Sequence, residues 1–479
     1  MATVTTTGGP AQSWNPRQGL STLSALALGI ALAACVAYLT LVSLQAACTV
    51  CVCLLIVGVY ARSRSVGMAL LWGFWLLAPL IRRLFGLQGP YISADPLALA
   101  PFLATAGCAA LELAIGGISR RALIVMGAAL AGYVLGIPAG IHSTSSMIFS
   151  LFAYGSAVGA LALGYREAST VRRGSAGGFS VRSTLLVLAP LLAVYAVIQY
   201  IGPLPRWDEV WIQSVNFTST GSPLLGHIRV WSTLNSPGTF GAIAGLAVLC
   251  YLGAKRFTIF TAIGLGVVLV ALALSFVRAA WVALVVAVFV LAVASRGRGG
   301  GRALAATAAV VGIVLALASS SPTVGAVLNR ANTLGSTGGD TSAQARLTRP
   351  QEVIPKAAKR PGGFGLGSAG ESSRLSPSSN DAIRASDNGY LALIYQVGLV
   401  GFVLVFGALI YSTRSAVRGV LRWRRDPASA LRLALLAFLF TMMFFGDMLY
   451  GITGVVFWYV LGSAMASEEI RTGGRWVAA

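Results

Sequence analysis

Three arginines and one aspartate stand where a mostly apolar chain becomes polar. Arg229 precedes an apolar segment, Arg278 lies in a short turn between two apolar segments, and Arg346 lies in a long polar stretch that ends at Asp387. The planar guanidinium of arginine pairs with phosphate oxygens, so several clustered arginines indicate a ligand that carries pyrophosphate. A carboxylate beside them could take a proton from a hydroxyl group.

Two of these residues have a structural interpretation as well as a functional one. An arginine at the end of a tight apolar hairpin, such as Arg278, is costly unless its side chain reaches the membrane interface or binds an anion. Asp387 opens an apolar segment, where its carboxylate, or the side chain of Asn388, could cap a helix. Asp387 could also serve as a general base, and one residue could do both.

A glycine-rich run, Gly362–Gly367, lies within the polar stretch. It could form an ordinary flexible turn, or its backbone N–H groups could approach phosphate oxygens. It lacks the Lys-Ser/Thr ending of a P-loop, so a nucleotide site is not indicated. Cys48, Cys51 and Cys53 lie in an apolar segment without histidine or acid, which favours small buried hydrophobic residues over a metal site. The sequence therefore predicts no metal and no cofactor.

Apolar helices must position these residues. The chain has 479 residues, of which 56% are hydrophobic and 10% are charged, and its mean hydropathy is +0.79. Soluble proteins carry about 25% charged residues. We predict an all-α polytopic membrane bundle of about fourteen spanning helices, with a large external loop between late helices. The predicted spans are 23–42, 46–60, 68–81, 97–118, 122–137, 147–163, 184–201, 238–252, 259–274, 279–293, 304–318, 389–411, 431–445 and 451–465.

Loop charges set the predicted topology. The short arginine-rich loops fall in the cytoplasm if both termini are cytoplasmic, and Arg82-Arg83 is the one clear violation. The polar N-terminus has no basic region before a short apolar one, so a cleaved signal peptide is not expected. The predicted parts are N-terminal helices (1–202), an external loop (203–236), further helices (237–320), a large external catalytic loop (321–386) and C-terminal helices (387–479).

The net charge of +21 does not indicate a nucleic-acid partner. Most arginines lie in short loops beside apolar segments, where positive charge orients membrane helices rather than binding nucleic acid. Glu112 is a lone acid inside the fourth predicted span and could pair with an arginine that the sequence does not identify.

Several of these segments resemble the O-antigen polymerase and O-antigen ligase superfamily. Residues 386–401 are similar to the signature that closes its large periplasmic loop, roughly His/Asp-Asn-x-Tyr-Leu followed by a glycine-hydrophobic-hydrophobic-glycine turn. Arg346 and the segment 361–367 resemble its arginine and glycine-rich segment. Ser275-x-x-Arg278 resembles its Ser-x-Ser-Arg turn, and residues 229–240 resemble its arginine and Asn-Pro-like segment.

The resemblance implies a GT-C-like glycosyltransferase. Members of the superfamily move glycan from an undecaprenyl-pyrophosphate carrier to an acceptor hydroxyl, without metal, at the outer face of the bacterial inner membrane. The implied partners are the lipid-linked oligosaccharide, an acceptor glycan or glycolipid and the bilayer, with chain-length regulators or flippases as candidate protein partners. Asp387 and Arg278 would then be catalytic, and Arg229, Arg278 and Arg346 would bind pyrophosphate. The supporting residues would be Asn388, Tyr390, Gly365 and Gly367.

Two departures from the superfamily pattern affect the choice of function. Ligases usually have histidine where Asp387 stands, which favours a polymerase of surface polysaccharide. The aromatic residue expected shortly after Arg346 is missing. A ligase that transfers glycan to lipid A core or another acceptor is the alternative. A transporter or flippase is the alternative from another class, but it would be expected to show internal repeats with paired broken helices, and we find no convincing repeat.

Overall fold

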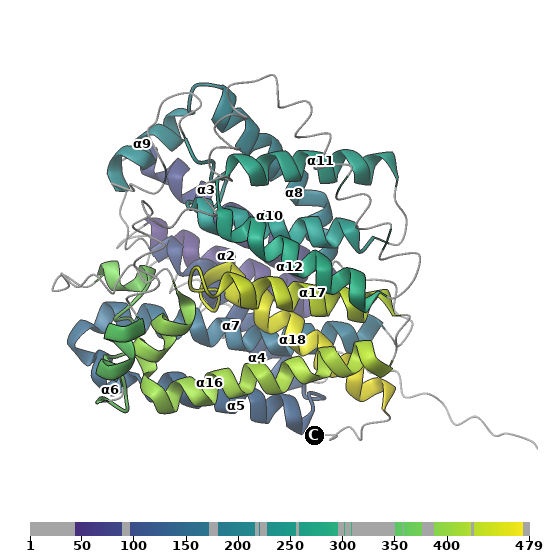
Figure 1. The fold of residues 1–479 in the computed structure, drawn as a ribbon. Helices are drawn as coiled ribbons and strands as arrows, with labels where there is room; N and C mark the ends of the chain where they lie inside the picture. Colours follow the sequence, from purple (N-terminus) through teal and green to yellow (C-terminus); the bar gives the residue numbers. More distant parts are fainter. Residues whose placement is uncertain are drawn as a thin grey trace, which may run out of the picture.

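The computed structural model describes twelve stretches of the chain and shows a bundle of long helices (Figure 1). Within them the structure contains no strand, so the predicted all-α class is confirmed. The predicted spans 23–42 and 304–318 lie outside the described residues. The described residues are 44–88, 96–171, 181–215, 220, 228–254, 258–295, 301, 308, 350–357, 359–375, 388–422 and 426–472.

The described helices agree with a chain that crosses the membrane many times. Six are long and apolar enough to cross a bilayer, and five shorter ones are also apolar. The helices are α2 (Leu44–Arg62), α3 (Arg64–Phe85), α4 (Ala100–Ile115), α5 (Arg120–Val134), α6 (Ile137–Gly140), α7 (Thr144–Val171), α8 (Val181–Ile201), α9 (Arg206–Val215), α10 (Pro237–Leu252), α11 (Ile259–Leu274), α12 (Arg278–Ala294), α16 (Gly389–Arg422), α17 (Pro427–Met442) and α18 (Gly451–Arg471).

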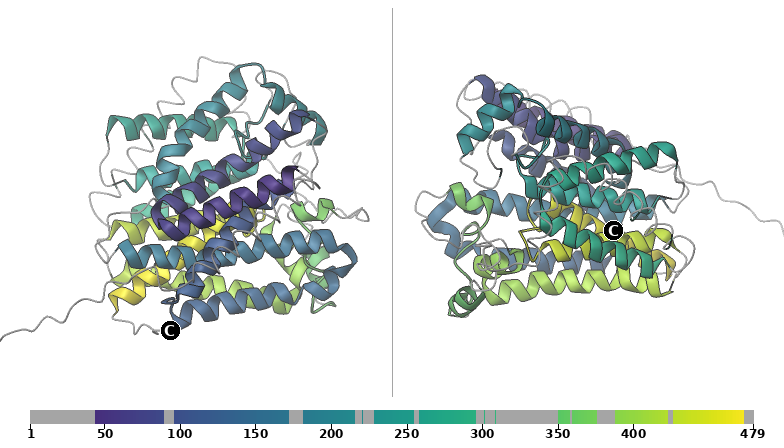
Figure 2. Two further views of the ribbon diagram at one scale, coloured as in Figure 1. Left: turned by 180° about the vertical axis from the view of Figure 1, so that it is seen from behind. Right: turned by 45° about the horizontal axis from the view of Figure 1, so that its top comes forward.

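Glycines bring the central helices into close contact. A Cβ atom added at Gly164 of α7 would lie 1.9 Å from the carbonyl oxygen of Tyr459 in α18. A Cβ atom added at Gly462 of α18 would lie 2.0 Å from the carbonyl oxygen of Leu161 in α7. Small residues at such crossings let two helix backbones touch, which is the usual basis of helix association in membranes. Helices α2 and α3 cover the opposite face of the bundle from α12 and α17 (Figure 2).

The helices alternate in direction, which brings the polar segments together at one end. Helices α3 and α8 finish at this end, and α10, α12 and α16 begin there (Figure 1). We call it the loop end, because α9, the segment 228–236 and the described glycine run also lie there. The sequence-predicted residues that the structure describes therefore gather at one end of the bundle.

The opposite end contains the partners of Glu112. The buried carboxylate of Glu112 accepts hydrogen bonds from Arg64 Nε (2.7 Å), Arg166 Nε (2.6 Å) and the Tyr60 hydroxyl (2.8 Å). A charge inside an apolar bundle is tolerated when it is paired and hydrogen-bonded. Glu112 thus joins α2, the start of α3, α4 and α7. The sequence predicted one unidentified arginine as its partner, and the structure shows two, Arg64 and Arg166.

Helix α16 is interrupted near the loop end. Gly398 has a φ of 70°, which breaks the helix and frees carbonyl groups of the preceding turn. The glycine run binds these groups: Phe364 N–H donates to the Tyr395 carbonyl (2.8 Å) and Gly365 N–H to the Gln396 carbonyl (3.1 Å). Because buried carbonyl groups need partners, this contact allows the break and fixes the glycine run against α16.

Replacing Gly398 with alanine should destabilise the protein strongly. The left-handed backbone costs about 1–3 kcal/mol for a residue with a side chain. The new Cβ atom would also lie 2.0 Å from the Pro361 carbonyl oxygen. The matched control is Gly407→Ala in the same helix, where a Cβ atom meets nothing within 4 Å. We expect a lower midpoint of thermal unfolding in detergent for Gly398→Ala only. Equal midpoints for the two variants would contradict this account of the break.

Candidate functional site

Arg229 is held against the turn between α11 and α12. It lies in the segment 228–236, and its backbone N–H donates to the Thr220 carbonyl (2.9 Å). Its side chain donates from Nε to the Ser275 carbonyl (3.3 Å) and from Nη2 to the Phe276 carbonyl (3.4 Å). These two contacts orient the guanidinium plane at the turn.

The same turn leads directly into Arg278, the first residue of α12. The Ser275 hydroxyl donates to the Leu272 carbonyl (2.6 Å) and accepts from Val277 N–H (3.3 Å), which keeps the turn tight. The structure therefore brings Arg229 to the turn that carries Arg278. The first N–H groups of a helix have no partner within the helix and favour an anion. Two half-buried arginines beside a helix N-terminus are suited to a diphosphate.

Backbone strain concentrates in these two segments. Among the described residues, three that are not glycine have a positive φ: Ser232 (53°), Asn235 (54°) and Phe276 (51°). Each such residue costs about 1–3 kcal/mol and persists only where its surroundings fix it. Strained residues are common at ligand-binding sites, so their restriction to the segments of Arg229 and Arg278 supports a functional site there.

The start of α16 is capped by Asn388. Its side-chain oxygen accepts from the backbone N–H groups of Tyr390 (3.0 Å) and Leu391 (3.2 Å). The Tyr390 hydroxyl donates to the Phe440 carbonyl (2.9 Å) and joins α16 to α17. Asp387 and Arg346 lie outside the described residues, so the predicted base and the third arginine remain predictions.

The two glycines predicted as supporting residues are close-packed. Gly367 N–H donates to the side-chain oxygen of Gln396 (3.0 Å), and Gly365 N–H is bound to the carbonyl of the same residue. A Cβ atom at Gly365 would lie 2.4 Å from Gly140 N, and one at Gly367 would lie 2.5 Å from the Ser146 carbonyl oxygen. The run is thus neither an open turn nor a set of N–H groups directed at phosphate, but a contact between the loop and the helices.

Sequence reasoning missed an acid beside the start of α16. Asp447, between α17 and α18, accepts from the Tyr154 hydroxyl (2.5 Å) and from Leu449 N–H (2.9 Å). The Tyr154 hydroxyl in turn accepts from Gln396 Nε2 (3.0 Å). A Cβ atom at Gly389 would lie 3.1 Å from the Cα atom of Asp447, so this acid is next to the first residue of α16. Its signal in the sequence was a lone acid in an apolar stretch.

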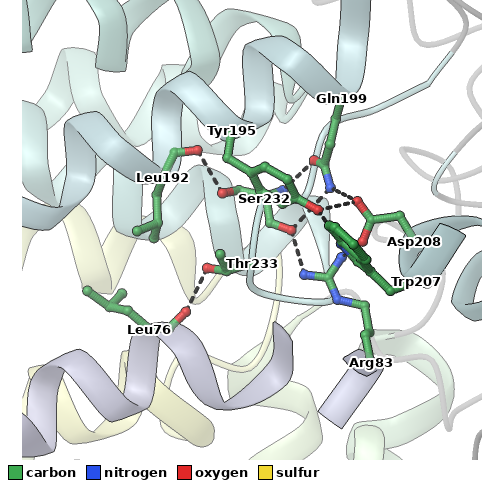
Figure 3. A network of polar contacts seen from close by, with 9 residues as sticks. All are labelled: Leu76, Arg83, Leu192, Tyr195, Gln199, Trp207, Asp208, Ser232 and Thr233. Carbon is green, nitrogen blue, oxygen red and sulfur yellow. Dashed lines mark hydrogen bonds and ion pairs between the residues drawn. The ribbon is translucent and has the colours of Figure 1, made fainter. Parts of the chain in front are cut away.

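One arginine of the Arg82-Arg83 exception to the charge rule lies inside the protein. The side chain of Arg83 is fully buried and forms an ion pair with Asp208 of α9, which is also fully buried. Arg83 Nη2 also donates to the Ser232 carbonyl (2.7 Å), as Figure 3 shows. A buried charge is tolerated when it is paired and hydrogen-bonded, so Arg83 can lie inside the protein at the loop end.

Fold and site define a multi-pass helical membrane protein with two arginines gathered at the loop end. Residues 263–406 match a family model described as O-antigen ligase, which confirms the resemblance to the O-antigen polymerase and ligase superfamily. The match includes Arg278, the glycine run and the first half of α16, and Arg229 lies before it. No curated protein and no solved structure gave a significant match.

The cap of α16 can be tested by substitution. Asn388→Ala removes the acceptor for two N–H groups and should lower the free energy of unfolding by about 1 kcal/mol. Asn388→Asp keeps an acceptor at this position and should leave that energy nearly unchanged. Chemical or thermal unfolding of the purified variants measures the difference. An alanine variant as stable as the natural protein would show that Asn388 does not stabilise the helix start.

Proposed function

We propose that this protein is a glycosyltransferase that moves glycan from undecaprenyl pyrophosphate to an acceptor hydroxyl. The observation that carries the proposal is the match of residues 263–406 to the O-antigen ligase family, which includes Arg278. The side chain of Arg229, anchored on the carbonyl groups of Ser275 and Phe276, supports it by adding a second guanidinium at the same turn.

The proposed reaction exchanges one glycosidic bond for another. The acceptor hydroxyl oxygen attacks the anomeric carbon of the donor sugar, and the bond from that carbon to the pyrophosphate oxygen breaks. The electron pair leaves with undecaprenyl pyrophosphate. Arg229 and Arg278 stabilise the negative charge that develops on this leaving group, and preorganised cations are effective at this task. Asp387 takes the proton of the acceptor hydroxyl.

The proposed site faces the extracytoplasmic side of the bacterial inner membrane. The carrier lipid lies in the bilayer beside the bundle, and its pyrophosphate reaches the loop end. Arginine is less strongly hydrated than lysine and presents a planar fork, so it suits a phosphate group at the rim of an apolar bundle. The lipid carrier already activates the sugar, so the reaction needs no nucleotide, and we propose that it needs no metal.

The acceptor distinguishes two versions of the reaction. Asp387, where ligases usually have histidine, favours a polymerase that lengthens surface polysaccharide. The description of the matched family as O-antigen ligase favours the second version, in which finished glycan moves to lipid A core or another acceptor. Both versions use the same donor and the same arginines.

Replacing either arginine should abolish most of the transfer. We expect Arg229→Ala and Arg278→Ala each to lower the rate by about 100-fold or more, as for other groups that stabilise a developing charge. The assay uses purified protein, a defined undecaprenyl-pyrophosphate oligosaccharide and mass spectrometry, in the presence of a chelator and without nucleotide. Arg414→Ala is the matched control, because Arg414 is exposed on α16.

The products decide among the alternatives. A ladder of lengthened glycans supports the polymerase, and a single transfer to an added lipid A core supports the ligase. Movement of the lipid-linked sugar across vesicles without formation of a new bond would support a flippase. Full activity of both arginine variants would contradict the proposed site.

A further inference from the structure

We infer that a buried polar cluster, formed by Arg83, Gln199 and Asp208 around Ser232, positions Arg229 for the pyrophosphate. The inference rests on the proposed function, because it concerns how one of the proposed phosphate-binding residues is held. We call this group the Ser232 clamp; Figure 3 shows it at the loop end of α3 and α8. Arg83, Gln199 and Asp208 are positioning residues, since they act through Arg229.

Every polar group of Ser232 has a partner, and the clamp supplies the partners of its backbone groups. Its backbone N–H donates to the side-chain oxygen of Gln199 (2.8 Å), and its hydroxyl donates to the Leu192 carbonyl (2.7 Å). Its carbonyl accepts from Arg83 Nη2 (2.7 Å) and from Gln199 Nε2 (3.2 Å). A single amide side chain thus binds both the N–H and the carbonyl of one residue, as a neighbouring strand would.

Strain at Ser232 explains why so many bonds are needed. Its φ of 53° is unfavourable for serine and persists only where surrounding contacts fix it. Ser232 follows Arg229 by three residues, so the conformation that the clamp holds sets the path of the chain next to Arg229. Thr233 adds an anchor, because its hydroxyl donates to the Leu76 carbonyl (2.6 Å). A segment that only linked α9 to α10 could adopt an unstrained backbone, so the strain at Ser232 indicates that this conformation has a role.

Asp208 binds the side chains of Arg83 and Gln199, which in turn bind Ser232. Its carboxylate pairs with Arg83 and accepts from Gln199 Nε2 (2.6 Å) and the Tyr195 hydroxyl (2.7 Å). The ring of Trp211 covers the Arg83 guanidinium, with 5.6 Å between the guanidinium carbon and the ring centroid. Both charges are fully buried, so Arg83 is committed to the interior and is not itself placed to bind the donor lipid.

The segment of Arg229 is therefore fixed from two sides. The clamp joins it to α3, α8 and α9, while Val230 N–H donates to the Leu274 carbonyl (3.3 Å) at the end of α11. The guanidinium contacts with Ser275 and Phe276 lie on that second side. Displacement of a binding group by about 1 Å can cost about 100-fold in rate, so loosening the clamp should weaken the action of Arg229.

A double-mutant cycle tests this coupling. Gln199→Leu removes both bonds to the backbone of Ser232 and one donor to Asp208, and it retains both members of the Arg83–Asp208 pair. We expect it to lower kcat/KM for the lipid-linked donor by about tenfold in the natural protein. In the Arg229→Ala background it should change kcat/KM by less than about twofold, because the group that it positions is gone. Gln213→Leu, on the exposed side of α9, is the matched control and should have no effect.

A third substitution separates positioning from stability. Glycine adopts a positive φ without strain, so Ser232→Gly should raise the unfolding temperature of Gln199→Leu. If the clamp only stabilised the fold, the double variant Gln199→Leu/Ser232→Gly would also regain transfer. We expect its transfer to stay low, since glycine makes the segment freer. If Gln199→Leu does not fold, Tyr195→Phe, which removes one bond to Asp208, replaces it in the same cycle.

The outcomes distinguish this inference from the proposed function. Full transfer by Arg229→Ala would overturn the proposed role of that residue and the inference with it. The inference alone would be overturned if Arg229→Ala loses transfer but Gln199→Leu has no effect. It would also be overturned if Gln199→Leu has an equally large effect in both backgrounds.

Discussion

Burial of charge inside an apolar bundle is the constraint on which the described structure depends. A bilayer offers no partner to a buried charge or a free backbone group, so the protein must supply one. Glu112 binds two arginines and a tyrosine, and Arg83 binds Asp208 and the Ser232 carbonyl. The break at Gly398 obeys the same rule, because the glycine run binds the carbonyl groups that the break frees.

This constraint separates structural charges from the candidate functional ones. Arg83 and Asp208 are fully buried and bind each other between α3 and α9. Arg229 and Arg278 are half-buried and lie at the loop end. Through the Ser232 carbonyl, the interior pair is bound to the segment that carries Arg229. The extent of burial thus separates the paired interior arginine from the two arginines that we propose bind the donor.

Hydropathy alone predicted the helices with good accuracy where the chain is uniformly apolar. The predicted span 259–274 coincides with α11, and the predicted span 279–293 falls one residue short of α12 at each end. Helix α9 was not predicted, because it is short and polar on one side and lies in what the sequence presents as a loop. Helix α16 continues to Arg422, beyond the predicted end at 411, because its last turns carry arginines on exposed faces.

The chemistry of the site was partly predictable. The motifs singled out Arg229 and Arg278 as candidates, and the structure adds that the Arg229 side chain binds the turn that leads into Arg278. The partners of Arg83 and Glu112 could not be read from the chain, because the pairs join residues 125, 48 and 54 positions apart. Local spacing carries no information on such contacts. The positive φ of Ser232 could not be predicted from the sequence either, since serine in a polar segment is an ordinary turn residue.

The central claim is that two arginines at the loop end bind the diphosphate of a lipid carrier. An experimental structure of the full chain in a lipid nanodisc with undecaprenyl pyrophosphate tests it most directly. The account predicts phosphate oxygens within hydrogen-bonding distance of the side chains of both Arg229 and Arg278. A diphosphate bound elsewhere on the bundle, with the two guanidinium groups turned away from it, would contradict the claim.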